Sequence, residues 1–193
     1  MLKLSAWHQF IIGLLLITLM AMTRGHHFAT LNHLPSASWA IFFLAGFYIS
    51  SKFIFPILLG LAGLLDFAAI TISGGSNYCA TLAYAMLLPA YGTLWLTGRW
   101  YTSQYQFALK SLVPLVLSVT IAAAITTVFS SGGFYFFSGQ YAQPSLIEFS
   151  QRFIKYYPRS LSNLAFYIGV VAIIHSYVSL TLGAKSTTSS SHS

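Results

Sequence analysis

The chain has 193 residues, of which 56% are hydrophobic and only 6% are charged. A soluble domain carries charge at about a quarter of its positions, so this composition excludes a water-soluble globule and indicates an integral membrane protein. The net charge of +7 comes from basic residues scattered singly between apolar runs, which is typical of loops at a membrane surface and argues against nucleic-acid binding.

The uncharged stretches predict one all-α domain over residues 1–184 with six membrane-spanning helices, because a helix crosses a bilayer in about 20 residues. The predicted helices cover residues 5–22, 36–51, 53–72, 78–97, 105–129 and 160–182. Turn-forming sequences at 33–35, 74–77 and 130–133 separate several of them. Pro56 either opens or kinks the third helix. The polar tail at 185–193 is predicted to be disordered.

The first predicted helix has an alternative interpretation as a signal peptide, with Lys3 ahead of an apolar core at residues 10–22. The uncharged stretch is long enough to span a bilayer, however, and no Ala-x-Ala cleavage site follows it. We therefore expect it to be a transmembrane helix.

Six spans place both termini on one side of the membrane, and the cations between the spans indicate which side. With cytoplasmic termini, the inner cations are Lys3, Lys52, Arg99, Lys110 and Lys185. The outer cations are then Arg24, Arg152, Lys155 and Arg159. Five inner cations against four outer ones favour cytoplasmic termini by a narrow margin.

The segment 130–158 is predicted to be a long outer loop rich in aromatic residues. Its aromatic side chains belong to Phe134, Tyr135, Phe136, Phe137, Tyr141, Phe149, Phe153, Tyr156 and Tyr157. One interpretation is an aromatic belt at the membrane interface, with cations at the lipid phosphates. The other is a lid over a large planar ligand.

Asp66 lies inside the third predicted helix, where an acid costs several kcal/mol unless it faces a partner or a cavity. It is therefore a functional candidate, the alternative being a structural acid bonded to the backbone or to neighbouring Tyr and Ser residues. Cys79 begins the next helix, so both residues should lie in the same half of the membrane and are able to share a pocket.

Cys79 is the single cysteine of the chain, which excludes an internal disulfide and a multi-cysteine metal site. At a helix N-terminus a thiol tends toward the thiolate, which is both a nucleophile and a soft metal ligand. Inert packing is the alternative for this residue.

A different class of function is a small membrane redox or haem-handling enzyme, with His8 and His175 as a pair of axial ligands. Lone histidines more often hydrogen-bond the backbone, which weakens this alternative. A structural subunit of a larger membrane complex is a third possibility. The sequence contains no P-loop and no common hydrolase motif, so no nucleotide-driven step is indicated.

The sequence GGSNYC at 74–79, with Asp66 before it, Tyr84 after it and Arg152 in the aromatic segment, resembles the BtuM-type vitamin B12 transporters. These bacterial proteins are relatives of the S-components of energy-coupling-factor (ECF) transporters. The resemblance implies a six-helix S-component-like bundle in the inner membrane, with a cobalamin pocket at its outer face.

The resemblance also implies the site residues. Cys79 would be the axial ligand of the cobalt, with the polar residues Asp66, Tyr84 and Arg152 around it, while Asn77 and Tyr78 would help to bind the ligand. A thiolate at that axial position has to displace the cyanide of cyanocobalamin, and Asp66, Tyr84 and Arg152 are expected to assist this exchange. The corrin nitrogens fill the equatorial positions of cobalt, so one soft thiolate is a sufficient protein ligand. This chemistry agrees with a chain that has one cysteine.

One feature departs from the S-component pattern. S-components that dock on a shared energising module usually carry Ala-x-x-x-Ala in the first helix, where small residues allow close helix approach. Ala6, Gly13 and Ala21 do not have that spacing. The departure puts the ECF module in doubt as a partner and favours a protein that works alone.

Overall fold

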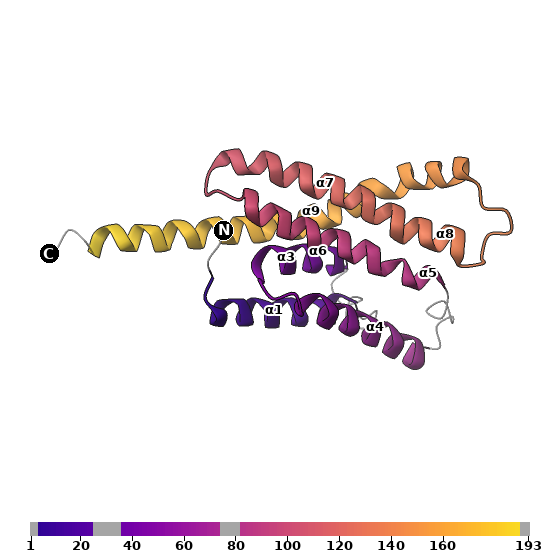
Figure 1. Cartoon of the computed structure of the whole chain (residues 1–193), viewed down its shortest axis with the longest axis horizontal. Helices are drawn as coiled ribbons and strands as arrows, with labels where there is room; N and C mark the ends of the chain where they lie inside the picture. The colour runs from indigo at the N-terminus through magenta and orange to yellow at the C-terminus, as the bar shows by residue number, and fades with distance from the viewer. Residues whose placement is uncertain (1–3, 25–35, 74–81, 190–193) are drawn as a thin grey trace.

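The structure is a computed structural model that describes residues 4–24, 36–73 and 82–189 (Figure 1). Within these residues every regular element is helical. The elements are α1 (Ala6–Arg24), α3 (Ser38–Tyr48), α4 (Ile54–Ser73), α5 (Leu82–Ala85), α6 (Leu87–Gln104), α7 (Leu112–Thr127), α8 (Gly133–Phe137) and α9 (Leu146–Ser189). A 3₁₀ turn (Leu109–Ser111) precedes α7, and a π-helical turn (Val128–Gly132) joins α7 to α8.

Four helices in the described part of the chain are long and apolar enough to cross a membrane. They are α1, the Ile54–Thr71 part of α4, the continuous Leu112–Phe137 helix and the Leu146–Thr181 part of α9. The prediction of an all-α protein is therefore confirmed for the described residues, and the four long apolar helices are consistent with a membrane bundle. Each of the six predicted spans overlaps a helix, but α3 is a shorter apolar helix, so six complete crossings stay a prediction.

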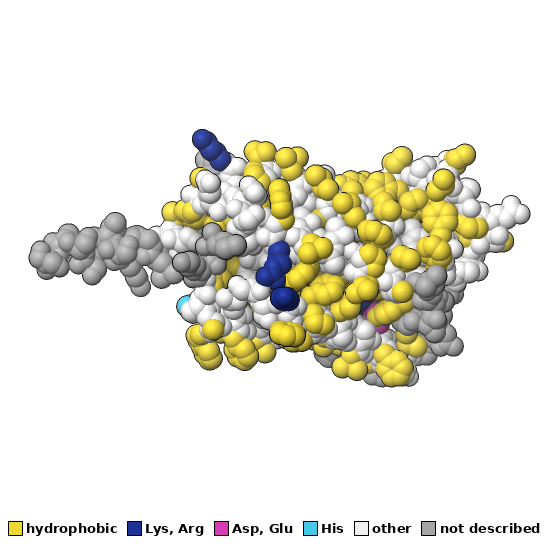
Figure 2. Space-filling view, viewed as in Figure 1, with side chains coloured by type: hydrophobic (Ala, Val, Ile, Leu, Met, Phe, Trp, Pro, Cys, Tyr) yellow, Lys and Arg dark blue, Asp and Glu magenta, His cyan; other side chains and the backbone are white. Residues whose placement is uncertain are grey.

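The exposed surface agrees with a lipid environment. Figure 2 shows hydrophobic side chains over much of the visible face, with basic side chains only in isolated places. Phe10 of α1, Leu117 of α7 and Ile173 of α9 are among the many large apolar side chains that are exposed. A soluble protein rarely leaves so many large apolar side chains exposed, whereas a bilayer covers them.

α3 forms the centre of the bundle and packs closely against α6. Its residues Ala40 to Phe43 are almost completely buried. A Cβ on Gly46 of α3 would lie 2.1 Å from the carbonyl oxygen of Trp95, and one on Gly98 of α6 would lie 2.0 Å from that of Phe43. The two glycines thus allow the backbones to touch, which is how helices associate in a membrane without help from the hydrophobic effect.

The segment 130–158 is mostly helical, so the prediction of a long outer loop is wrong. The helix continues from α7 through the π-helical turn into α8, and α9 already begins at Leu146. Gly132 and Gly133 were expected to break the chain, but they allow close packing instead. A Cβ on Gly133 would lie 2.5 Å from the Cβ of Met86, and one on Gly132 would lie 3.2 Å from the ring of Phe149.

Two prolines lie inside helices of the structure. Pro158 lies inside α9 rather than before it, and the Ser162 hydroxyl donates a hydrogen bond to the Pro158 carbonyl. Neighbouring helices and such hydroxyls make proline tolerable in membrane helices. Pro56 opens α4, because it falls in the first turn of that helix.

Two further boundaries differ from the predicted ones. The fifth predicted helix starts at Leu112 rather than at residue 105, because the Ser111 hydroxyl and the backbone of Gln106 hydrogen-bond to each other and close a turn. At the end of the chain, α9 extends to Ser189, past residue 182, where the sixth predicted helix was expected to end. Residues 190–193 of the predicted disordered tail lie outside the described residues.

Candidate functional site

Asp66, the acid expected to need a partner, forms a bidentate ion pair with Arg24. The Nη2 and Nε atoms of Arg24, the last residue of α1, each lie 2.7 Å from one carboxylate oxygen of Asp66 in α4. The side chains are only 11% and 24% exposed, respectively. Arg24 was expected to be an outer loop cation, but it lies within the bundle and neutralises the acid.

Three hydroxyl groups complete the hydrogen bonding of this pair. The Tyr84 hydroxyl of α5 donates to Asp66 Oδ2 at 3.0 Å. Arg24 Nη1 donates to the Ser38 hydroxyl of α3 at 2.9 Å and to the Tyr91 hydroxyl of α6 at 2.8 Å. The Arg24–Asp66 cluster, defined as Arg24, Ser38, Asp66, Tyr84 and Tyr91, therefore joins five helices.

Tyr91 is held in place from its other side. Its ring stacks on Phe42 of the central helix α3, with the ring centroids 4.3 Å apart and the planes nearly parallel. The Arg24 guanidinium lies 5.7 Å from the centroid of the Tyr91 ring, within the range of a cation–π contact. Because aromatic packing restrains Tyr91, the hydroxyl that accepts the hydrogen bond from Arg24 has a defined position.

Every member of the cluster except Tyr84 lines a cavity of about 510 Å³ whose wall is partly polar. The lining residues are Thr23, Arg24, Ser36, Ser38, Trp39, Asp66, Tyr91, Ser160, Asn163 and Leu164. A volume of this size suits a small-molecule group, and the lining combines one aromatic wall with several hydrogen-bonding side chains. The cavity is thus able to bind a polar, uncharged part of a ligand, since its one cation and one anion neutralise each other.

Arg152 belongs to a second cavity, of about 380 Å³, at the aromatic segment. Its Nη2 atom pairs with Glu148 Oε1 at 2.9 Å, and its Nη1 atom donates to the Tyr141 hydroxyl at 3.1 Å. The guanidinium also lies 4.7 Å from the Tyr141 ring centroid and 5.3 Å from that of Tyr135. Tyr135 donates to the other oxygen of Glu148 at 2.8 Å, so the segment is folded around its own ion pair.

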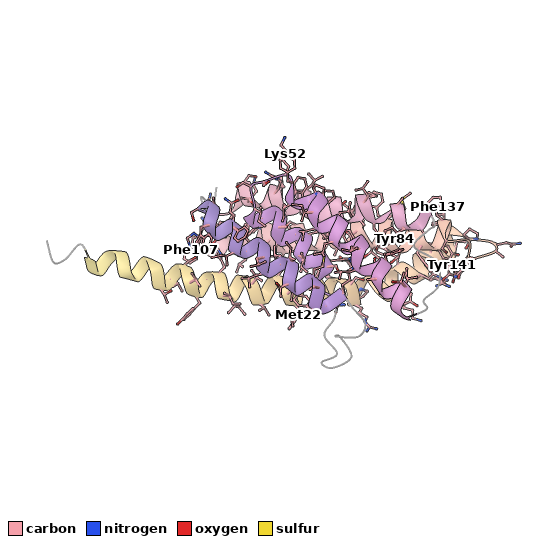
Figure 3. The ribbon with its side chains drawn as sticks, turned by 90° about the horizontal axis from the view of Figure 1, so that it is seen from below. Met22, Lys52, Tyr84, Phe107, Phe137 and Tyr141 are labelled. Atoms are coloured by element: carbon pink, nitrogen blue, oxygen red, sulfur yellow. The ribbon has the colours of Figure 1, made fainter. Side chains whose placement is uncertain are left out.

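The predicted site residues fall into three groups. Asp66 and Tyr84 are in direct contact through the Tyr84 hydroxyl, a bond that the sequence did not predict. Arg152 lines a cavity that has no lining residue in common with the Arg24–Asp66 cavity. In Figure 3 Tyr84 nevertheless lies toward the same end of the bundle as Phe137 and Tyr141, away from Phe107. Asn77, Tyr78 and Cys79 lie outside the described residues.

Sequence reasoning missed Arg24, Ser38, Tyr91 and Asn163 as members of the site. For Arg24 a signal was present: an acid inside a span requires a partner, and Arg24 directly follows an uncharged run that ends in the predicted outer half. The other three are common polar residues, and only the helix packing distinguishes them from similar residues elsewhere.

The histidines proposed as haem ligands do not come together as a free pair. His175 Nδ1 lies 3.0 Å from the Tyr48 hydroxyl, and its Nε2 lies 2.9 Å from the Tyr105 hydroxyl. Both ring nitrogens are thus occupied, and ligation of iron would break one of these bonds. His8 bonds to Ser5 at the start of α1. Among the described residues, no group of three or more His, Cys, Asp or Glu side chains is arranged to hold a metal ion.

Comparison of the chain with protein-family models and with curated proteins finds no match in either case. The GGSNYC sequence at 74–79, the two cavities and the chemistry of their walls are therefore the indications of function in this chain.

Proposed function

We propose that this protein carries cobalamin, or a related corrinoid, across the bacterial inner membrane, and that Cys79 is the axial ligand of the cobalt. The observation that supports this proposal most directly is the hydrogen bond between Tyr84 and Asp66. These two residues flank the segment 74–81 in sequence, and their contact joins α4 to α5. Cys79, the proposed cobalt ligand, belongs to this segment in sequence.

The chemistry of the two cavities suits the two kinds of surface on a corrinoid. Its rim carries amide groups, which pair well with hydroxyl, amide and guanidinium side chains such as Ser160, Asn163 and Arg24 of the larger cavity. Its flat ring suits aromatic walls such as those of Tyr141 and Phe149 in the cavity that contains Arg152. The proposed fold is correspondingly an S-component-like bundle of six helices.

The proposed reaction with cyanocobalamin is a ligand exchange without a change of redox state. The Cys79 thiolate donates an electron pair to Co(III), the Co–CN bond breaks, and cyanide leaves with its electron pair and takes a proton from water. In this proposal Asp66, Tyr84 and Arg152 orient the ring and stabilise the charge that shifts during the exchange, because fixed charges act strongly where water is excluded. Asn77 and Tyr78 contribute further contacts beside Cys79.

Uptake is the direct test. The chain is expressed in a bacterium that lacks its own vitamin B12 importer and any ECF energising module, and that needs cobalamin for methionine synthesis. We expect growth at low cobalamin concentration, because the proposed transporter does not need an ECF energising module. Absence of growth, with the protein demonstrably in the membrane, would contradict the proposal.

A binding measurement separates this proposal from the enzyme alternative. Protein purified after growth with cobalamin should show the visible spectrum of a corrin, whereas a haem protein would show a Soret band. Addition of cobinamide, which lacks the nucleotide loop, would show whether recognition depends on the ring or on the loop. A Soret band, or failure to bind either corrinoid, would refute the assignment.

A further inference from the structure

A third cavity, of about 440 Å³, lies between α3, α6, α7 and α9 and shares no lining residue with the other two. Its wall is mostly apolar and aromatic, with Phe43 and Phe47 from α3, Leu115 from α7 and Ile168 from α9. We call it the His175 cavity, because His175 also lines it. Because most of the wall is apolar, the cavity suits an apolar ligand better than a polar one.

Several polar groups in this wall are hydrogen-bonded to one another or to the backbone. Tyr48 and Tyr105 occupy the two ring nitrogens of His175, and the Tyr101 hydroxyl donates to the Ser111 carbonyl at 3.1 Å. The Ser111 hydroxyl bonds to the backbone of Gln106. These groups keep the wall rigid and leave few donors for a polar ligand, which favours a hydrocarbon chain as the occupant.

The rim of the cavity is accessible from the lipid phase. Phe107, Leu112 and Leu180 line the cavity and are also exposed. In Figure 3 Phe107 lies at the end of the bundle opposite to Phe137 and Tyr141. Since exposed apolar side chains of this protein contact lipid, an acyl chain can enter here without passing through water.

A lysine in the turn beside the cavity favours an anionic headgroup. Lys110 is exposed and lies in the short turn between Ala108 and Ser111, both of which line the cavity. The chain has two acids, Asp66 and Glu148, and each is paired with an arginine in another cluster. No acid of the chain therefore neutralises Lys110, and an anionic headgroup is the complementary partner.

We propose that the His175 cavity holds one acyl chain of an anionic phospholipid, with the lipid phosphate at Lys110. This proposal is independent of the transported substrate. A lipid bound between α3, α6, α7 and α9 would stabilise their packing, and the stability of the protein would depend on membrane composition.

Native mass spectrometry tests the site directly. The protein is reconstituted with equal amounts of phosphatidylglycerol and phosphatidylethanolamine, released into detergent, and weighed with its retained lipids. We expect one retained phosphatidylglycerol. Ala172→Phe fills the cavity and should remove that lipid, whereas Ala165→Phe, on the exposed face of the same helix, should keep it. A wild-type protein without bound lipid, or equal retention by both variants, would overturn the proposal.

The headgroup is tested separately by Lys110→Gln, which leaves the core intact even if Ala172→Phe does not fold. It should reduce the preference for phosphatidylglycerol over phosphatidylethanolamine about fivefold, as expected for one cation near a lipid surface. Lys52→Gln changes an exposed lysine that does not line the cavity and should leave the preference unchanged. Retention of phosphatidylethanolamine, detergent or a second copy of the chain in place of phosphatidylglycerol would also refute the proposal.

Discussion

Replacing Asp66 by Asn tests whether the Arg24–Asp66 pair holds the bundle together. The substitution keeps the shape of the side chain but removes the charge that compensates Arg24, whose side chain is 11% exposed. Leaving one member of a buried pair without its partner costs about 3–5 kcal/mol. Because Asp66 retains 24% exposure, we expect a loss near the lower limit, about 3 kcal/mol in the free energy of unfolding.

A double-mutant cycle isolates the pair from the other bonds of Arg24. Arg24→Gln alone also removes hydrogen bonds to Ser38 and Tyr91, so its cost includes more than the ion pair. The double variant should be more stable than the sum of the single losses predicts, by about 2 kcal/mol. The measurement is equilibrium unfolding in mixed micelles with increasing dodecyl sulfate, followed by near-ultraviolet circular dichroism. Additive losses, or a loss below about 1 kcal/mol for Asp66→Asn, would show that the pair is not coupled.

Three further predictions concern packing, chemistry and topology. Gly98→Ala should lower the unfolding temperature strongly, because the new Cβ would lie 2.0 Å from the Phe43 carbonyl oxygen. The control Gly60→Ala places a Cβ with nothing within 4 Å of it, so it should leave the unfolding temperature unchanged or raise it. Equal effects of the two changes would contradict the proposed close contact of α3 with α6. Cys79→Ser should leave the visible spectrum of bound cyanocobalamin like that of the free vitamin, because a hydroxyl is a poor ligand for cobalt, while the wild-type spectrum shifts over time. Identical spectra for the two proteins would exclude cobalt ligation by Cys79. A cysteine introduced at His192 should be protected from a membrane-impermeant reagent in intact cells, and its labelling would reverse the expected orientation of the termini.

Local sequence properties were sufficient to predict the class of the protein and most of its helices. Length, hydropathy and the scarcity of charge are properties of single segments, and a bilayer imposes its thickness on each segment independently. The same arithmetic put Asp66 in the outer part of its helix and Tyr84 shortly after the next turn. The rise per residue of two antiparallel neighbours predicted a common membrane depth for Asp66 and Cys79, whereas the hydrogen bond from Tyr84 to Asp66 was not predicted.

Only the tertiary structure decided which polar and small residues meet. Arg24 and Asp66 are 42 positions apart, and no local pattern distinguishes an arginine at the end of a span that faces water from one that neutralises a buried acid. Gly132, Gly133 and Pro158 have the composition of a loop, yet they are helical, because the small glycines admit Met86 and Phe149 and a serine hydroxyl bonds the proline carbonyl. Helix propensity is a property of a single residue. The free-energy cost of a buried charge or of a void depends instead on the neighbouring side chains in the packed bundle.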